Sequence, residues 1–154
     1  MSGTLHRISR SVIIAAPIEQ VFHFHDNTDN LLKITPPHIK VAIESRGMPG
    51  LGYEVHLRVR QFGLLTMNWH VKITEYVSPT RMVDEQISGP FASWKQMRDL
   101  RVVDGGTELT DTVEYAVPFG PLGQLANWLV IQREIEGMFA YRQQATKRLL
   151  EAST

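Results

Sequence analysis

Residues 122–150, LGQLANWLVIQREIEGMFAYRQQATKRLL, carry the pattern that decides the fold. Apolar side chains recur in this stretch at helical spacing, at Leu125, Leu129, Ile135, Met138, Phe139, Ala145 and Leu149. The spacing predicts one helix of about 28 residues, which is roughly 42 Å long at 1.5 Å per residue. Gly137 lies inside it at a cost of about 1 kcal/mol relative to alanine, and we expect close packing against the sheet at that point.

Upstream of this helix, the chain alternates in the manner of β-strands. Residues 53–61 and 65–77 place apolar side chains on one face and polar side chains on the other, which is typical of an antiparallel sheet with one covered face. Pro17 and Glu19 indicate the start of a short helix after the first strand, and a second short helix is expected over residues 30–34. Further strands are expected over residues 5–15, 38–46, 81–88, 92–103 and 107–117.

The element order is therefore strand, two short helices, six strands and a long helix. The long helix is the only element large enough to cover the apolar face of the sheet. The predicted fold class is α+β, with a curved antiparallel sheet of about seven strands wrapped around the C-terminal helix. A curved sheet leaves space beside a single helix, where a small, mostly apolar ligand can bind. We expect residues 1–154 to form a single ligand-binding domain.

The composition excludes several classes of function. Sixteen basic and sixteen acidic residues cancel, so no excess of positive charge indicates nucleic acid or an anionic membrane as a partner. The chain contains no cysteine, which excludes thiolate chemistry and is typical of a reducing compartment. The longest apolar runs have about five residues, against the roughly 20 that a membrane span requires. We therefore expect a cytoplasmic protein without integral membrane association.

Three motifs follow one another along the chain. They are Ala16-Pro17-Ile18-Glu19-Gln20-Val21-Phe22, then Gly89-Pro90-Phe91 followed by Trp94, then Asp111-Thr112-Val113-Glu114-Tyr115 leading into Pro118-Phe119-Gly120-Pro121-Leu122-Gly123. In this order they resemble the START-like, or SRPBCC, superfamily of helix-grip proteins, which includes polyketide cyclase/dehydrase and lipid-transfer proteins. The resemblance spans nearly the whole chain and implies a cavity. Members of the superfamily bind lipids, polyketides, hormones or quinones, and some are enzymes.

One segment departs from the pattern of the proteins that the chain resembles. Those proteins carry Trp-x-His-x-His-x-Phe after Gly-Pro-Phe, and the matching run here is Trp94, Gln96, Arg98 and Leu100. Both histidines are replaced. Any role that these histidines have in the similar proteins therefore does not transfer to this chain.

The hairpin at Asp104-Gly105-Gly106-Thr107 sets which side chains face the cavity. With Gly105-Gly106 as its loop, Leu100 lies opposite Asp111 and Arg98 is diagonal to Asp111. The apolar face of this hairpin should be concave, and it carries Trp94, Gln96, Arg98, Leu100, Val102, Leu109, Asp111, Val113, Tyr115 and Val117. A slip of one residue would turn the charged side chains inward, so the pattern holds the register. The facing of residues 81–91 is left open, because the bend at Gly89-Pro90 predicts a bulge.

We expect the ligand to meet a polar spot on an otherwise apolar wall. The candidate ligand-binding residues are Trp69, Trp94, Gln96, Arg98, Asp111, Val113, Tyr115, Phe119 and Leu122. Two interpretations of Arg98 stay open. It forms an ion pair with Asp111 that only joins two strands, or it offers its remaining donors to a ligand oxygen while Asp111 orients it. Tyr115 is interpreted as cavity wall or core rather than as a general acid.

The six histidines do not predict a metal site. His56 and His70 face each other if the hairpin that contains them is symmetric about Gly63, but they lie on the outer face and no carboxylate offers a clear third ligand. We interpret them as a solvated cross-strand pair. Motifs that bind nucleotide phosphates or dinucleotides do not occur, and no cofactor is predicted.

Three functions remain open. The first is a carrier or sensor of a small hydrophobic or aromatic ligand, lipid-, polyketide- or quinone-like, with an oxygen-bearing end near Arg98. The second is an enzyme of the cyclase, dehydratase or hydrolase type, in which Arg98 polarises a carbonyl while Asp111 or Tyr115 moves a proton. The third is an accessory module that docks its apolar mouth on a larger enzyme. A dimer is also compatible with the sequence, which does not identify the ligand.

Overall fold

The computed structural model describes residues 4–61 and 65–152. The chain begins with β1 (His6–Ile14), α1 (Ile18–Asp26) and α2 (Asn30–Lys33). Six further strands follow, which are β2 (Lys40–Arg46), β3 (Glu54–Gln61), β4 (Leu65–Val77), β5 (Arg81–Ser88), β6 (Ser93–Val103) and β7 (Gly106–Ala116). The C-terminal part consists of α3 (Gly120–Ala126), the π-helical turn η1 (Asn127–Ile131) and α4 (Gln132–Ala152). Gly63, the expected centre of the β3–β4 hairpin, lies outside the described residues.

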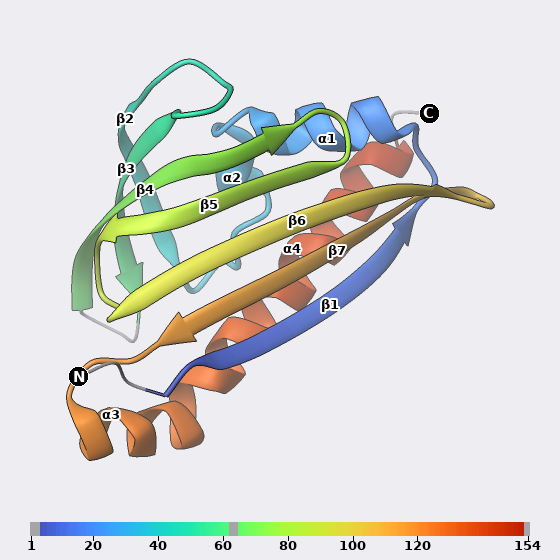
Figure 1. Ribbon diagram of the computed structural model, residues 1–154. Coiled ribbons are helices and arrows are strands. Elements are labelled where there is room, and N and C mark those ends of the chain that lie inside the picture. Colours follow the sequence, from blue (N-terminus) through green and yellow to red (C-terminus); the bar gives the residue numbers. More distant parts are fainter. Residues whose placement is uncertain (1–3, 62–64, 153–154) are drawn as a thin grey trace.

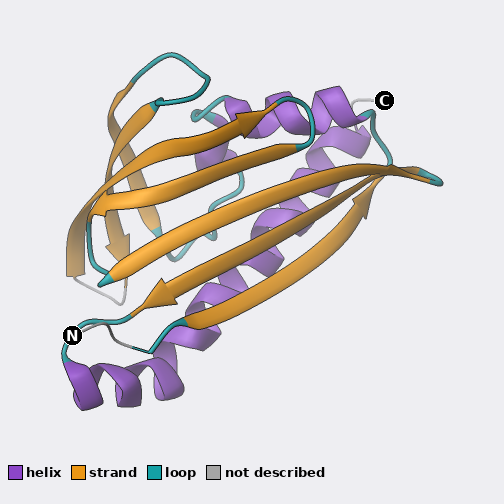
Figure 2. Cartoon of the chain, viewed as in Figure 1, coloured by secondary structure: helices purple, strands orange, loops and turns teal. Residues whose placement is uncertain are grey.

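The strands form one antiparallel sheet in the order β1-β7-β6-β5-β4-β3-β2. The sheet is curved, and α4 runs along its concave side together with the shorter helices α1 and α2 (Figures 1 and 2). The prediction of an α+β helix-grip fold is confirmed. Each strand starts and ends within about two residues of its predicted bounds, because alternation of side chains in a half-covered sheet reports the strands directly.

Two groups of buried side chains hold the sheet against the helices. One contains Phe22 of α1, Leu109 of β7 and Leu150 of α4. The other contains Tyr115 of β7 and Phe139 of α4. Full burial of one large apolar side chain stabilises a fold by about 1.5–3 kcal/mol. Since α4 contributes to both groups, it is held against the sheet over most of its length.

The β6–β7 hairpin differs from the predicted register by two residues. Arg98 lies directly opposite Asp111 instead of diagonal to it. The two-residue loop is Asp104-Gly105 and not Gly105-Gly106, since Val103 pairs with Gly106. Gly105 has a φ of 89°, and aspartate followed by glycine suits a tight turn that needs positive φ. A shift of two residues leaves each side chain on its predicted face, so Arg98 and Asp111 still point to the concave side.

The facing of β5, which the sequence left open, is set by a bulge close to the predicted position. His70 of β4 pairs with Ser88, and Val71 then pairs with Gln86, so Ile87 has no partner in this pairing. Beyond the bulge, Asp84 lies opposite Gln96 of β6 and is only 8% exposed. The bulge therefore turns a carboxylate toward the concave side of the sheet.

Glycines in the C-terminal helices differ from expectation. Gly137 of α4 is exposed, and no neighbouring atom lies within 4 Å of the place where a Cβ would be. The expected close packing at Gly137 is therefore wrong. The close approach occurs at Gly123 of α3, where a Cβ would collide with the carbonyl oxygen of Pro118. Within the described residues, no helix is long and apolar enough to cross a bilayer.

Candidate ligand-binding site

Two adjoining cavities lie between the sheet and the helices. The inner cavity has a volume of about 120 Å³ and is lined by side chains of α1, α2, α4 and strands β3 to β6. The outer cavity has a volume of about 660 Å³ and lies among β4, β6, α3, η1 and α4. Trp69, Trp94 and Met138 line both cavities and are called the partition below.

The outer cavity has almost entirely apolar walls. Besides the partition, its lining includes Phe91, Val117, Phe119, Leu122, Ile131 and Ile135. Phe119 is 81% exposed and Leu122 is 76% exposed, so both predicted residues lie at its rim. The sharp turn from β7 into α3 explains their position, because Phe119 has a φ of 72° and Gly123 allows the helix to approach Pro118. An apolar hollow with an apolar rim suits a hydrophobic molecule.

Aromatic side chains build the partition. The rings of Trp69 and Trp94 meet edge to face with centroids 5.0 Å apart, and Phe91 lies 4.9 Å from Trp94. Phe139 of α4 stacks on Trp94 at 6.4 Å. Trp69 Nε1 is buried without a hydrogen-bond partner in the described part of the chain. Because such a donor usually finds a partner when it is buried, Trp69 offers an unused donor at the boundary between the cavities.

The inner cavity gathers the polar and charged side chains. His25, Asp84, Gln96, Arg98 and Arg142 all line it. Arg98 Nη1 lies 3.5 Å from Asp84 Oδ2, and Arg98 Nε lies 3.8 Å from Asp111 Oδ1. Charge-assisted hydrogen bonds of this type are usually about 2.7–2.9 Å long. Neither carboxylate therefore binds the donors of Arg98 at the length of a strong hydrogen bond.

Asp111 is held mainly by α4. Gln143 Nε2 donates to Asp111 Oδ2 at 3.0 Å and to the carbonyl oxygen of Arg10 at 2.8 Å. Asp111 does not line the inner cavity but a much smaller space of about 10 Å³ beside it, together with Arg98 and Gln143. Asp111 therefore lies beside Arg98 without facing the inner cavity itself. The predicted proximity of Arg98 and Asp111 is thus present, with Gln143 as an unforeseen third member.

Burial changes the charge states in this group. Burial, and then the positive charge of Arg98, lower the pKa of His25 to about 4, so this imidazole is neutral near pH 7. Burial raises the pKa of Asp84 above its ordinary value, although Arg98 opposes this effect. Burial, and then Arg98, lower the pKa of Arg142 to about 10. The inner cavity thus contains two guanidinium groups and a carboxyl group that is easier to protonate than usual.

The two ring nitrogens of His25 have different roles. Nδ1 lies 2.9 Å from the carbonyl oxygen of Val21. Since a carbonyl oxygen only accepts, Nδ1 is the nitrogen that carries the proton. In the neutral ring Nε2 then has a free lone pair and can accept a hydrogen bond or a proton.

The remaining predicted residues lie in the core. Val113 and Tyr115 are 1% and 0% exposed, and neither is among the described residues that line the two cavities. The Tyr115 hydroxyl donates to Asn127 Oδ1 at 2.6 Å, and burial raises the pKa of Tyr115. Its ring lies 6.2 Å from Trp94. Tyr115 therefore packs near Trp94 of the partition without lining either cavity.

Sequence reasoning missed His25, Asp84, Arg142 and Gln143 as members of this group. A signal existed for the last two, because Arg142 and Gln143 follow Met138 and Phe139 by four residues and share the buried face of the long helix. His25 likewise follows Val21 by four residues in α1. A polar residue on an apolar helical face indicates a buried polar site. No comparable signal existed for Asp84, since its facing depends on the bulge in β5.

Comparison with known proteins agrees with this architecture. The model of a protein family described as "Polyketide cyclase / dehydrase and lipid transport" matches residues 6–151. No curated protein sequence matches the chain. Protein CV1439 from Chromobacterium violaceum has 14% sequence identity and a TM-score of 0.75, with 95% of this chain and 98% of that chain covered.

Two further solved structures are similar over their full length. TTHA0849 from Thermus thermophilus has 18% identity and a TM-score of 0.72, with 98% of this chain and 100% of that chain covered. The Zhui aromatase/cyclase from Streptomyces sp. R1128 has 18% identity and a TM-score of 0.70, with 97% and 98% covered. At this level of identity the similarity establishes the fold.

Proposed function

The chain belongs to the polyketide cyclase/dehydrase and lipid transport family, and on this premise we propose that it binds an amphipathic small molecule as a carrier or sensor. The apolar or aromatic body of the ligand occupies the outer cavity. Its oxygen-bearing end passes the partition and reaches Arg98 in the inner cavity. Lipid-, polyketide- and quinone-like molecules all have this form.

One observation carries the proposal, namely that Arg98 faces the inner cavity and that no carboxylate in the described part of the chain binds its donors closely. The nearest approach of a carboxylate to Arg98 is 3.5 Å from Asp84. A ligand carbonyl, phenol or carboxylate can therefore accept from Arg98 without displacing a strong hydrogen bond. Arg142 adds a second positive charge, and the raised pKa of Asp84 makes this carboxyl group easier to protonate than usual. These charges support binding of an anionic or strongly polarised oxygen.

The volumes support the same division of the ligand. The outer cavity, at about 660 Å³, lies in the range of about 300–1,000 Å³ that is common for small-molecule sites. The inner cavity of about 120 Å³ admits only a small group. Met138 in the partition is unbranched and adapts easily to different neighbours, and Trp69 Nε1 supplies a donor beside the passage. We expect the polar end to pass between these two side chains.

Narrowing of the outer cavity tests whether this space holds a ligand. Ala126 lines the outer cavity but is exposed, so Ala126→Trp fills part of the entrance without overpacking the core. We expect 2-naphthoate to bind the native protein with 1:1 stoichiometry in isothermal titration calorimetry and to bind Ala126→Trp at least about tenfold more weakly. Ala152→Trp, at an exposed position near the end of α4, is the matched control. Equal binding by all three proteins would place the ligand elsewhere and refute the proposal.

Catalysis of the dehydratase or cyclase type is a second candidate function, and the unprotonated Nε2 of His25 favours it. In a β-hydroxy carbonyl compound whose carbonyl oxygen accepts from Arg98, Nε2 would remove the proton of the carbon between the two groups. The carbon–carbon double bond forms as the C–O bond breaks, and a proton from Asp84 lets the hydroxyl leave as water. His25 then returns its proton to Asp84 through water. Loss of turnover with retained binding in His25→Asn is the expected result.

The other predicted roles have weaker support. Asp111 and Tyr115, the proton-moving groups expected from the sequence, do not line the inner cavity within the described residues. His25 and Asp84 do line it. Docking of the apolar rim on a partner enzyme or a second copy stays a prediction.

A further inference from the structure

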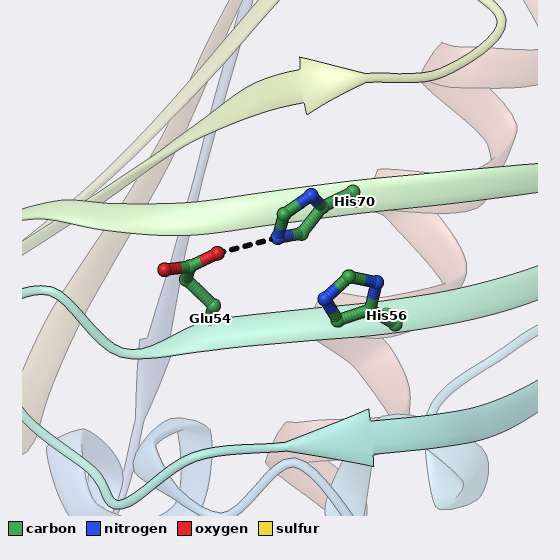
Figure 3. A group of neighbouring side chains, drawn as sticks. All are labelled: Glu54, His56 and His70. Atoms are coloured by element: carbon green, nitrogen blue, oxygen red, sulfur yellow. Dashed lines mark hydrogen bonds and ion pairs between the residues drawn. The ribbon is translucent and has the colours of Figure 1, made fainter.

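The outer face of the sheet carries a second cluster of chemically active side chains. Glu54 and His56 are two residues apart on β3 and therefore lie on the same face of the sheet, and His70 lies directly opposite His56 on β4. Figure 3 shows the carboxylate of Glu54 and the two imidazoles directed toward one another above the strands. We propose that these three residues bind one divalent metal ion of the zinc type, on the face of the sheet opposite the ligand cavities.

The spacing of the ligating atoms supports this proposal. Glu54 Oε1 lies 2.6 Å from His70 Nε2, and the rings of His56 and His70 stack with centroids 3.8 Å apart. One potential ligand atom from each residue lies within 4.8 Å of the others. In a tetrahedral zinc site with bonds of about 2.0–2.1 Å, neighbouring ligand atoms are ~3.3 Å apart. Small rotations of the three side chains are therefore enough to form the site.

The donor set selects the class of metal. Two imidazole nitrogens and one carboxylate oxygen suit zinc and its neighbours among the transition metals, whereas calcium and magnesium require oxygen ligands throughout. Glu54 and His56 are exposed, so a fourth position would be open to water. Three protein ligands with one open position form a site that can exchange its metal and bind a further small ligand.

The charges around the cluster are compatible with a cation. Arg58, the next outward-facing residue of β3, forms an ion pair with Glu44 at 2.8 Å. Lys72 lies opposite Glu54 in the pairing of β3 with β4. Glu54 is diagonal to His70 and not directly opposite it, which is why pairing by register alone assigned it to Lys72 and left the histidines without a carboxylate.

The site would also lie against the cavity wall. His70 is flanked in sequence by Trp69 and Val71, and both of these line the inner cavity on the other side of the sheet. Val55, between Glu54 and His56, lines it as well. A metal held by both strands would fasten β3 to β4 where they form this wall, and so stabilise the sheet.

Titration of the untagged, EDTA-treated full chain with zinc chloride tests the site. Isothermal titration calorimetry should show 1:1 binding, and zinc at about 100-fold excess over Kd should raise the Tm by about 5–10 °C. Each of His56→Gln and His70→Gln should weaken zinc binding at least tenfold, since even residues that only support metal ligands contribute this much. His38→Gln is the matched control. His38 forms a similar pair with Glu134 at 2.7 Å, but among the described residues it belongs to no group of three potential metal ligands.

The possible outcomes separate clearly. Selective loss of binding in the His56 and His70 variants, with His38→Gln unchanged, supports the site. Absence of saturable zinc binding in the native protein overturns it, and so does undiminished binding in His56→Gln, which is exposed and can be checked for folding by circular dichroism. If His70→Gln fails to fold, Glu54→Gln takes its place. Since this site uses none of the cavity residues, its failure leaves the proposed ligand binding untouched.

Discussion

Arg98 has an unusual environment for a buried arginine. Its guanidinium group is flanked by Asp84 and Asp111 at 3.5 and 3.8 Å, and Arg142 lines the same cavity. A buried charge normally requires close and complete hydrogen bonding. Here the two carboxylates lie near Arg98 but farther away than in a strong charge-assisted hydrogen bond. The proposed function takes Arg98 as a ligand-binding group on the basis of this arrangement, whereas the alternative is an arginine that only joins two strands.

The lowered pKa of His25 predicts that the fold becomes less stable in acid. The pKa is 6.5 in the unfolded chain and about 4 in the folded protein, so between these values only the unfolded chain is protonated at this residue. Stability that is complete above pH 6.5 is therefore lost as the pH falls through about 4. The loss should be on the order of 1–3 kcal/mol.

Urea unfolding of the native protein and of His25→Asn checks this prediction. Asparagine can still donate to the carbonyl oxygen of Val21, but it does not titrate. The native protein should lose stability relative to the variant between pH 6.5 and 4. Asp84 has the opposite effect, because its raised pKa contributes stability below its unfolded value of 3.8 that is lost at higher pH, but Asp84 is present in both proteins. Parallel pH profiles would contradict the buried, neutral state of His25.

At the level of the elements, substitution of Gly137 in α4 and of Gly123 in α3 should have opposite effects on stability. Gly137→Ala should raise the free energy of unfolding by about 0.5–1 kcal/mol, because alanine favours the helix and its Cβ meets no atom within 4 Å. Gly123→Ala should lower it by at least about 1–3 kcal/mol, because its Cβ would collide with Pro118. Thermal or urea unfolding of both variants measures the difference. A destabilising Gly137→Ala would mean that α4 has a packing partner at this residue.

Sequence patterns predicted strands and helices better than they predicted pairings. The register of β3 with β4 is confirmed for Glu54 with Lys72 and His56 with His70, because both charge and apolar pattern fix it. The register of β6 with β7 was wrong by two residues, since such a shift keeps every side chain on the same face and costs the apolar pattern nothing. The turn residues Asp104-Gly105 fix the register of this hairpin instead.

The spacing of apolar residues did not predict the irregular elements of the fold, which are a π-helical turn and a β-bulge. The π-turn η1 interrupts the long C-terminal helix and buries Asn127 beneath the Tyr115 hydroxyl. One extra residue in a helical turn rotates the side chains of α3 relative to those of α4, and the spacing of apolar residues does not predict it. The bulge at Ile87 likewise changes which residues of β5 face the helices, so the alternation of side chains does not predict the facing of Asp84. Among the polar residues that line the inner cavity, Asp84 is the one whose facing depends on such an irregularity, so its place in the site was not predictable from periodicity.

At the level of the whole molecule, sheet and helices divide the interior by polarity. Apolar residues at the α3 end surround the outer cavity, and polar or charged residues from β5, β6, α1 and α4 form part of the wall of the inner one. The sequence predicted both the curved sheet around a helix and a polar spot within it, because alternation places Gln96, Arg98 and Asp111 on the apolar face. Of the residues predicted to bind the ligand, Trp69, Trp94, Phe119 and Leu122 line the outer cavity.

The most direct test of ligand binding through Arg98 compares 2-naphthoate with naphthalene on the native protein and on Arg98→Met, by isothermal titration calorimetry. Arg101→Met is the control, because Arg101 lies on the same strand but is exposed and pairs with Glu108 at 2.6 Å. We expect Arg98→Met to weaken 2-naphthoate binding by about 10–100-fold, the value of hydrogen bonds to a charged group, and to leave naphthalene binding unchanged. Equal affinity of the native protein and Arg98→Met for 2-naphthoate would contradict a ligand held by Arg98.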